Sequence, residues 1–281
     1  SMTWLWGKVY LRVASRGKGL QKESLGYPMG SFGEVFEALG ERIAGQGGEV
    51  HISAGVKRVV VENGVATGLE VELPDRGPEI INPEIINPEI INPEIINYDA
   101  IIATTPSYVF TRLAPALPDD YREKLEGIRY LSAVLMILVL DRPLSSKYWI
   151  SIADTTLPFV AIIEHTNMID RSLYGGRHIV YISNYPSRES PLYQKSAEEL
   201  LEEFIPHLRK VNPDFDPSWI LEYHHHKLDG AQPIVGVNYG RSIPDHQTPF
   251  KNLYLANTTQ IYPEDRGTNY SVRLGRRVAA R

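Results

Sequence analysis

Apolar residues recur along the chain at two periods, one typical of helices and the other typical of strands. Residues 31–43 place an apolar residue at every third or fourth position, which predicts a helix with one apolar face. The members of that face are Phe32, Val35, Phe36, Leu39 and Ile43. Ser31 and Glu34 at its start predict a capping box, in which each side chain bonds a backbone N–H of the other residue.

Runs of strand-forming residues precede and follow this helix. We predict strands over residues 3–14, 49–53, 56–62 and 65–73, with a loop over residues 16–30. Asn63-Gly64 separates the last two strands and predicts a tight hairpin, because both turn residues tolerate a positive φ.

The remainder of the chain alternates strands with helices. Further strands are predicted over residues 98–104, 129–140, 159–164, 178–183, 219–227 and 253–256. Helices are predicted over residues 119–126 with Asp119 as the cap, over 197–211 behind a capping box of Ser196 and Glu199, and from about residue 269 to the end. Gly175-Gly176 is typical of a turn. These elements predict an α+β fold with a mostly antiparallel or mixed sheet and flanking helices.

Residues 78–97 repeat Pro-Glu-Ile-Ile-Asn four times. A period of five fits neither strand nor helix, and a proline in every copy would interrupt a central sheet. We predict an expanded surface loop at a hairpin tip, and the alternative is an assembly or docking element.

Composition narrows the classes of function. The 281 residues carry a formal net charge of −5 and no cysteine, which excludes disulfides and thiolate metal sites. No basic run favours a nucleic-acid partner. The longest apolar run, residues 133–140, is far shorter than a membrane span requires. We expect a cytoplasmic location and a small-molecule substrate.

The C-terminal segment predicts a site that favours negative charge. A strand ends at Asn257, and Gly267 and Thr268 lead into the last helix. Free N–H groups and the positive end of the helix dipole favour negative charge at such a helix start. The alternative is a terminal helix that only packs against the sheet.

Several stretches resemble one superfamily of FAD proteins, that of the flavin amine oxidases, protoporphyrinogen oxidases and phytoene desaturases. They are residues 26–71 (GYPMGSFGEV to GVATGLEV), 98–106 (YDAIIATTP) and 252–281. Residues 157–169, 175–186 and 262–272 resemble most closely a subset that is similar to UDP-galactopyranose mutase.

The resemblance implies a partial FAD-binding domain in residues 31–105 and 252–281, with residues 1–30 and 106–251 forming a substrate-binding domain. It also implies roles for single residues: Val56 meets the adenine, Asn257 lies near the ribityl or pyrophosphate group, and Gly267, Asn269, Tyr270 and Ser271 border the flavin.

The chain departs from the superfamily at two points. It has no strand followed by Gly-x-Gly-x-x-Gly, the fingerprint that holds the FAD pyrophosphate. Ala256-Asn257 stands where the superfamily has Gly-Glu or Gly-Asp. We therefore expect this chain to start after an N-terminal portion and to bind FAD weakly or not at all by itself.

Candidates for a substrate pocket are His165, Asn167, Tyr185, Tyr223 and Arg266, with ordinary core or surface polar residues as the alternative. His224 and His226 share a strand face but lack a third ligand, so no metal is predicted. No catalytic residue is assigned. The resemblance implies an FAD-dependent oxidoreductase that accepts hydride from an unknown substrate. The alternatives are a non-redox isomerase like UDP-galactopyranose mutase and a non-catalytic binding domain.

Overall fold

The computed structural model describes residues 2, 5–7, 9, 10, 26–72, 94–264 and 266–280. The chain folds into two compact units, because Arg129–Ile234 (unit 2) is inserted between Ser1–Ile128 and Val235–Arg281 (together unit 1). These boundaries differ from the predicted ones at residues 105 and 252. The cofactor and substrate roles of the two parts stay predictions.

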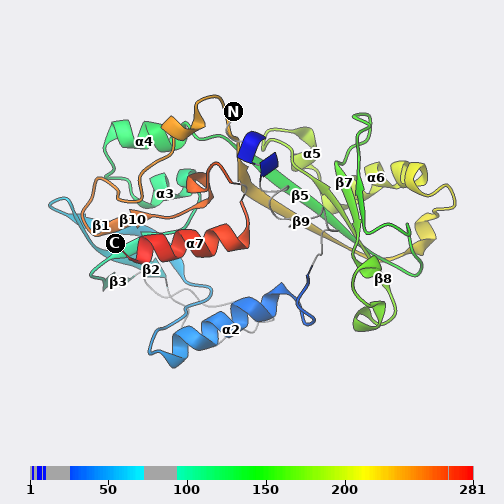
Figure 1. Cartoon of the computed structure of the whole chain (residues 1–281), viewed down its shortest axis with the longest axis horizontal. Coiled ribbons are helices and arrows are strands. Elements are labelled where there is room, and N and C mark those ends of the chain that lie inside the picture. Colours follow the sequence, from blue (N-terminus) through cyan, green and yellow to red (C-terminus); the bar gives the residue numbers. More distant parts are fainter. Residues whose placement is uncertain are drawn as a thin grey trace. The chain divides into compact units, whose positions relative to one another are not determined.

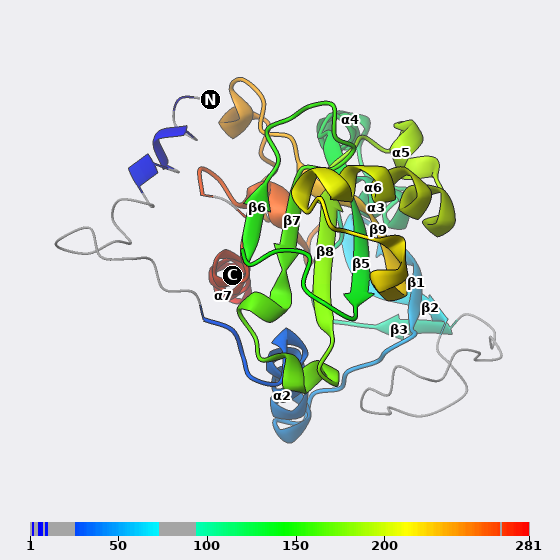
Figure 2. The same ribbon diagram turned by 90° about the vertical axis from the view of Figure 1, so that its right-hand side faces the viewer.

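Unit 2 is built on a five-stranded antiparallel sheet, whose strands lie side by side in Figure 2. Its order is β6 (Trp149–Ser151), β7 (Ala161–Glu164), β8 (His178–Asn184), β5 (Tyr130–Leu140) and β9 (Ile220–Pro233). Every second residue of β5 is buried, which is the period of a strand with one face on the core. The helix α6 (Ala197–Val211) covers that face with Leu200, Phe204 and Leu208.

Short helices complete unit 2. They are η1 (His165–Asn167), η2 (Arg171–Tyr174), α5 (Pro191–Gln194) and η3 (Pro217–Trp219). The predicted capping box of Ser196 and Glu199 is confirmed at the start of α6. Gly175 and Gly176 have positive φ, which confirms the predicted turn before β8.

Unit 1 holds two small sheets (Figure 1). One is antiparallel, with β1 (Gly55–Glu62), β2 (Val65–Glu72) and β3 (Glu94–Asn97). In the other, β4 (Ile101–Ala103) runs parallel to β10 (Leu253–Leu255). The helices and helical turns are α2 (Phe32–Gly45), α3 (Ser107–Leu113), α4 (Asp119–Glu126), η4 (Tyr239–Arg241), η5 (Thr258–Gln260) and α7 (Thr268–Ala279).

Two apolar clusters hold unit 1 together. The larger one joins β1, β4, β10, α3 and α4 through side chains that include Val59, Ile101, Phe110, Leu125, Leu253 and Leu255. The smaller one consists of Ala256, Ile261, Leu274 and Val278. Because Leu274 and Val278 belong to α7, this second cluster packs α7 against the segment that leaves β10.

Several local predictions are wrong, each for a physical reason. Residues 49–53 form no strand, since no described strand pairs with them and Ser53 has φ 55°. Residues 5–7, 9 and 10 are helical rather than extended, in keeping with the four-residue spacing of Leu5 and Val9. The cap of α4 is Pro118 and not Asp119.

The predictions for α2 and the repeat need correction too. Ser31 caps α2 but accepts the N–H of Gly33, so the predicted capping box with Glu34 does not form. The apolar face of α2 is exposed. The repeat ends in a strand and not in a loop, because β3 pairs with β2. The four residues of β3 contain no proline, and the remaining repeat residues lie outside the described part of the chain.

Candidate functional site

The carboxyl ends of β4 and β10 are joined by the side chain of Asn257, which is 6% exposed. Its Oδ1 accepts from the backbone N–H of Thr259 at 3.1 Å and from the Thr259 hydroxyl at 2.5 Å. Its Nδ2 donates to the carbonyl of Thr105 at 2.9 Å and to Oγ of Ser107 at 3.3 Å. Both lone pairs and both N–H groups of this amide are therefore used within the protein.

A second polar group lies at the same edge. Oγ1 of Thr105, just after β4, is buried and has no hydrogen-bond partner within the described residues. A buried hydroxyl without a partner is uncommon in folded proteins, and a bound molecule is one way to satisfy it. Because β4 and β10 are parallel, their carboxyl ends open on the same edge, where open α/β sheets bind their ligands.

Within the described part of the chain, no side chain caps the start of helix α7. Its N-cap is Gly267, whose backbone is extended, and a Cβ there would lie 2.8 Å from Oδ1 of Asn269. The N–H groups of Tyr270 and Ser271 donate to the carbonyl of Gly267, so among the described residues those of Thr268 and Asn269 are left for another partner. Asn269 and Ser271 are exposed beside them. The arrangement suits an electron-rich or anionic group.

Tyr270, in the same turn, is held by charged neighbours. The guanidinium of Arg273 lies 4.9 Å from the centre of the Tyr270 ring and 2.5 Å from the carboxylate of Glu264. Burial is the largest single effect on the pKa of Glu264 and acts to raise it. The hydrogen bond from Arg273, a backbone hydrogen bond and the charges of Arg273 and Arg277 together outweigh burial, so the pKa is lowered. A hollow of about 140 Å³ adjoins these groups, lined also by Gln260, Ile261, Tyr262, Pro263, Leu274 and Arg277.

The structure brings together most of the predicted cofactor residues. Gly267, Asn269, Tyr270 and Ser271 share the first turn of α7, and Asn257 directly follows the residue that packs against that helix. Val56 lies apart from them, on β1, where it is 38% exposed.

The predicted substrate residues are more scattered. His165 is buried in η1, with Nε2 2.7 Å from the hydroxyl of Tyr174, and burial lowers the pKa of His165. Asn167 donates its amide to the carbonyls of Ser145 at 2.8 Å and Lys147 at 3.1 Å. Both residues therefore bond to the protein itself.

The two tyrosines of this set occupy other places. Tyr185 directly follows the end of β8, whereas His165 lies beside the beginning of β8. The seven residues of this strand span about 20 Å, so the two residues lie far apart. Tyr223 lies on β9 and donates its hydroxyl to Glu198 at 3.4 Å. Arg266 belongs to unit 1. Within unit 2 these side chains do not form one pocket.

Sequence reasoning missed one polar group of unit 2, formed by Glu164, His178 and Arg171. Glu164 closes β7 with its side chain wholly buried, and His178 opens β8. The only signal in the sequence is a carboxylate that directly follows three apolar strand residues. His224 and His226 are exposed, and the described residues contain no group of three metal-ligating side chains.

Comparison with known proteins gives one family. The sequence profile described as "Flavin containing amine oxidoreductase" matches residues 19–281. No curated protein sequence matches the chain. In the part of the chain that the structure describes, no helix has both the length and the apolar character needed to cross a bilayer.

Solved structures with the same fold belong to several enzymes. An oxidoreductase from Methanosarcina mazei has TM-score 0.60 and 20% identity over 82% of this chain and 49% of its own. Reduced UDP-galactopyranose mutase has TM-score 0.59 and 15% identity over 85% of this chain and 50% of its own. Putrescine oxidase bound to putrescine has TM-score 0.60 and 15% identity, over 90% and 52%. The chain thus spans about half the length of these structures, and the mixed α+β fold class is confirmed.

Proposed function

Because the chain belongs to the flavin containing amine oxidoreductase family, we propose that it supplies the closing half of an FAD site in an oxidoreductase. The observation that carries the proposal is the start of α7, which no side chain among the described residues caps and which packs beside the strand end at Asn257. The other half of such a site is the pyrophosphate-binding fingerprint, which these 281 residues do not contain.

The residues fit an FAD in three ways. The N-terminus of α7 presents N–H groups and a positive dipole to the electron-rich pyrimidine edge of the flavin. Gly267 keeps that approach clear of a side chain. The hydroxyl of Thr105, which has no hydrogen-bond partner among the described residues, offers one more hydrogen bond at the sheet edge.

The bound flavin would supply the redox chemistry, accepting a hydride from a C–H bond of the substrate while the adjoining C–N or C–C bond is oxidised. Gly267, Asn269 and Ser271 would border its ring, and Tyr270 would be held in place by Arg273. Val56 would meet the adenine. We assign Asn257 a positioning role, since its amide is already used in joining β4 to β10.

The substrate itself stays open, with His165, Asn167, Tyr185, Tyr223 and Arg266 as pocket candidates. The likeness to UDP-galactopyranose mutase is one of fold, at 15% identity, and nothing else favours the isomerase. The non-catalytic alternative likewise has no observation of its own.

The test adds one negative charge where the flavin is proposed to bind. Asn269→Asp, made in the complete coding sequence of the gene, should weaken FAD binding at least about tenfold, or roughly 1.4 kcal/mol, by repelling the electron-rich ring edge. An aspartate in a first helical turn stabilises the helix, so lost binding would not reflect unfolding.

Asn63→Asp is the matched control, because it makes the same charge change in the β1–β2 turn, where aspartate tolerates the φ of 51°. FAD affinity is measured by equilibrium titration with flavin fluorescence. Equal affinities for the two variants would refute the placement of flavin at α7.

A further inference from the structure

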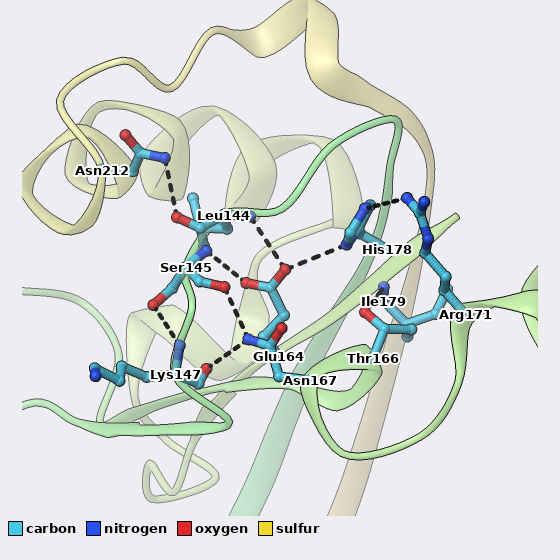
Figure 3. Close-up of polar contacts among 10 residues, drawn as sticks. All are labelled: Leu144, Ser145, Lys147, Glu164, Thr166, Asn167, Arg171, His178, Ile179 and Asn212. Carbon is cyan, nitrogen blue, oxygen red and sulfur yellow. Dashed lines mark hydrogen bonds and ion pairs between the residues drawn. The ribbon is translucent and has the colours of Figure 1, made fainter. Parts of the chain in front are cut away.

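Three side chains of unit 2 form a line at the end of the sheet, drawn in Figure 3. Nη1 of Arg171 lies 3.3 Å from Nε2 of His178, and Nδ1 of His178 lies 3.6 Å from Oε1 of Glu164. Glu164 is completely buried and His178 is 9% exposed. The imidazole therefore separates a cation from a buried carboxyl group.

The carboxyl group of Glu164 also fastens the loop between β5 and β6. Its two oxygens accept the backbone N–H groups of Leu144 at 3.2 Å and Ser145 at 2.6 Å. Asn212 and Asn167 hold the carbonyls of the same two residues, at 3.0 Å and 2.8 Å. Glu164 is the only one of these side chains with a titratable group.

The chemistry of arginine fixes the tautomer of His178. A guanidinium has only donors, so a hydrogen bond from Arg171 requires that Nε2 of His178 accept. The proton of a neutral imidazole must then sit on Nδ1, where it points toward Glu164. Charge on Glu164 is thereby linked to the hydrogen bond of Arg171, although the two residues do not touch.

The charges around this line decide which group titrates. Burial raises the pKa of Glu164 to about 7, against the lowering effect of the N–H groups of Ser145 and Leu144. Burial and the charge of Arg171 lower the pKa of His178, while Asp141 acts in the opposite direction.

Two further charged or titratable groups are close. Arg142 pairs with Asp141 at 2.8 Å, and the ring of His165, next to Glu164, turns to the hydroxyl of Tyr174. Neither one bonds to the carboxyl group of Glu164. The proton uptake of this cluster therefore centres on Glu164.

We propose that Arg171, His178 and Glu164 form a proton-responsive latch between η2 and the β5–β6 loop. On acidification one solvent proton binds Nε2 of His178, and the proton on Nδ1 passes to Oε1 of Glu164. His178 remains neutral but in the other tautomer. The Nε2–H of His178 now faces the N–H donors of Arg171, so the hydrogen bond between Arg171 and His178 breaks. The neutral carboxyl group of Glu164 also accepts weaker hydrogen bonds from the backbone N–H groups of the β5–β6 loop.

The tautomer of His178 can be read directly by NMR. Long-range ¹H–¹⁵N correlation of the 281-residue chain labelled at histidine distinguishes the Nδ1–H form, the Nε2–H form and imidazolium, and His178→Gln assigns the signal. We expect the Nδ1–H form at pH 8.5 and the Nε2–H form at pH 5.5. A single unchanged tautomer, or conversion to imidazolium, would overturn the proposal.

Two variants separate the latch from a general response to pH. Glu164→Gln offers a permanent N–H to Nδ1, so His178 should show the Nε2–H form at every pH. Arg171→Met removes the donor at the other end, and the Nε2–H form should persist to higher pH than in the wild type. Arg177→Met, an exposed arginine beside His178, should leave the tautomer change as it is. An Arg171→Met titration identical to that of Arg177→Met would contradict the coupling.

Discussion

The buried carboxyl group of Glu164 should make the stability of unit 2 fall as the pH rises. Its pKa is about 7 in the folded protein, against an ordinary value of 4.5. The native state therefore binds this proton more tightly than the unfolded state does, and its contribution to stability is present below pH 4.5 and lost as the pH approaches 7. At about 1.36 kcal/mol for each pH unit, the loss amounts to roughly 3 kcal/mol.

Glu164→Gln removes this titration and adds a constant cost. The amide oxygen still accepts one backbone N–H, but the amide NH₂ group is a donor and leaves the second backbone N–H without an acceptor. This lowers the free energy of unfolding by about 1–3 kcal/mol at any pH. The advantage of the wild type over the variant should therefore be largest near pH 4.5 and shrink by roughly 3 kcal/mol by pH 8.

Urea unfolding measured by hydrogen exchange of peptides from β5 and β8 gives the stability of unit 2 at each pH. Glu202→Gln, at an exposed position of α6, is the matched control and should show a difference that does not vary with pH. A Glu164→Gln difference that is equal at pH 5 and pH 8 would refute the reasoning, since it would mean that burial does not hold the proton on Glu164.

Two further substitutions test the packing around each site. Asn257→Ala should lower the free energy of unfolding of unit 1 by about 3 kcal/mol, because it removes the four side-chain hydrogen bonds that join β4, β10 and η5. Urea unfolding measures this cost, and an unchanged stability would contradict the role of Asn257. Phe204→Ala should cost unit 2 about 3–5 kcal/mol, because the ring is 1% exposed and packs edge-on against Phe159 at 5.3 Å; a cost below about 1 kcal/mol would show that the core refills.

Elements with a strong local signal could be predicted from the sequence. The capping box at Ser196 places α6 correctly, because its two hydrogen bonds involve residues three positions apart. The hairpin at Asn63-Gly64 forms with φ of 51° and 77°, as its residue types require. The start of α7 could likewise be predicted, since Gly267 precedes a run of helical period.

Elements that depend on distant partners could not be predicted. Residues 49–53 have strand-forming side chains, but none of the strands in the described part of the chain pairs with them. The end of the repeat becomes β3 because β2 offers an edge, although its sequence period suggests a loop. The side-chain amide of Asn257 bonds to Thr105 and Ser107, which lie about 150 positions away in the sequence, so its role could not be predicted locally.

The latch in unit 2 was hidden for the same reason. Glu164 bonds to residues 19 and 20 positions earlier, and His178 joins it only because β7 and β8 pair. Arg171 reaches the imidazole from the helical turn η2. A sequence read along its length shows three ordinary polar residues where the fold makes one connected group.

The flavin content of the full-length protein tests the central claim most directly. The complete gene product is purified, incubated with FAD, desalted and examined by absorbance near about 450 nm, with the released cofactor identified by chromatography. The proposed function gives about one FAD for each chain, and reduced retention in the Asn269→Asp variant but not in Asn63→Asp. A protein that is folded yet retains no flavin after this treatment would contradict it.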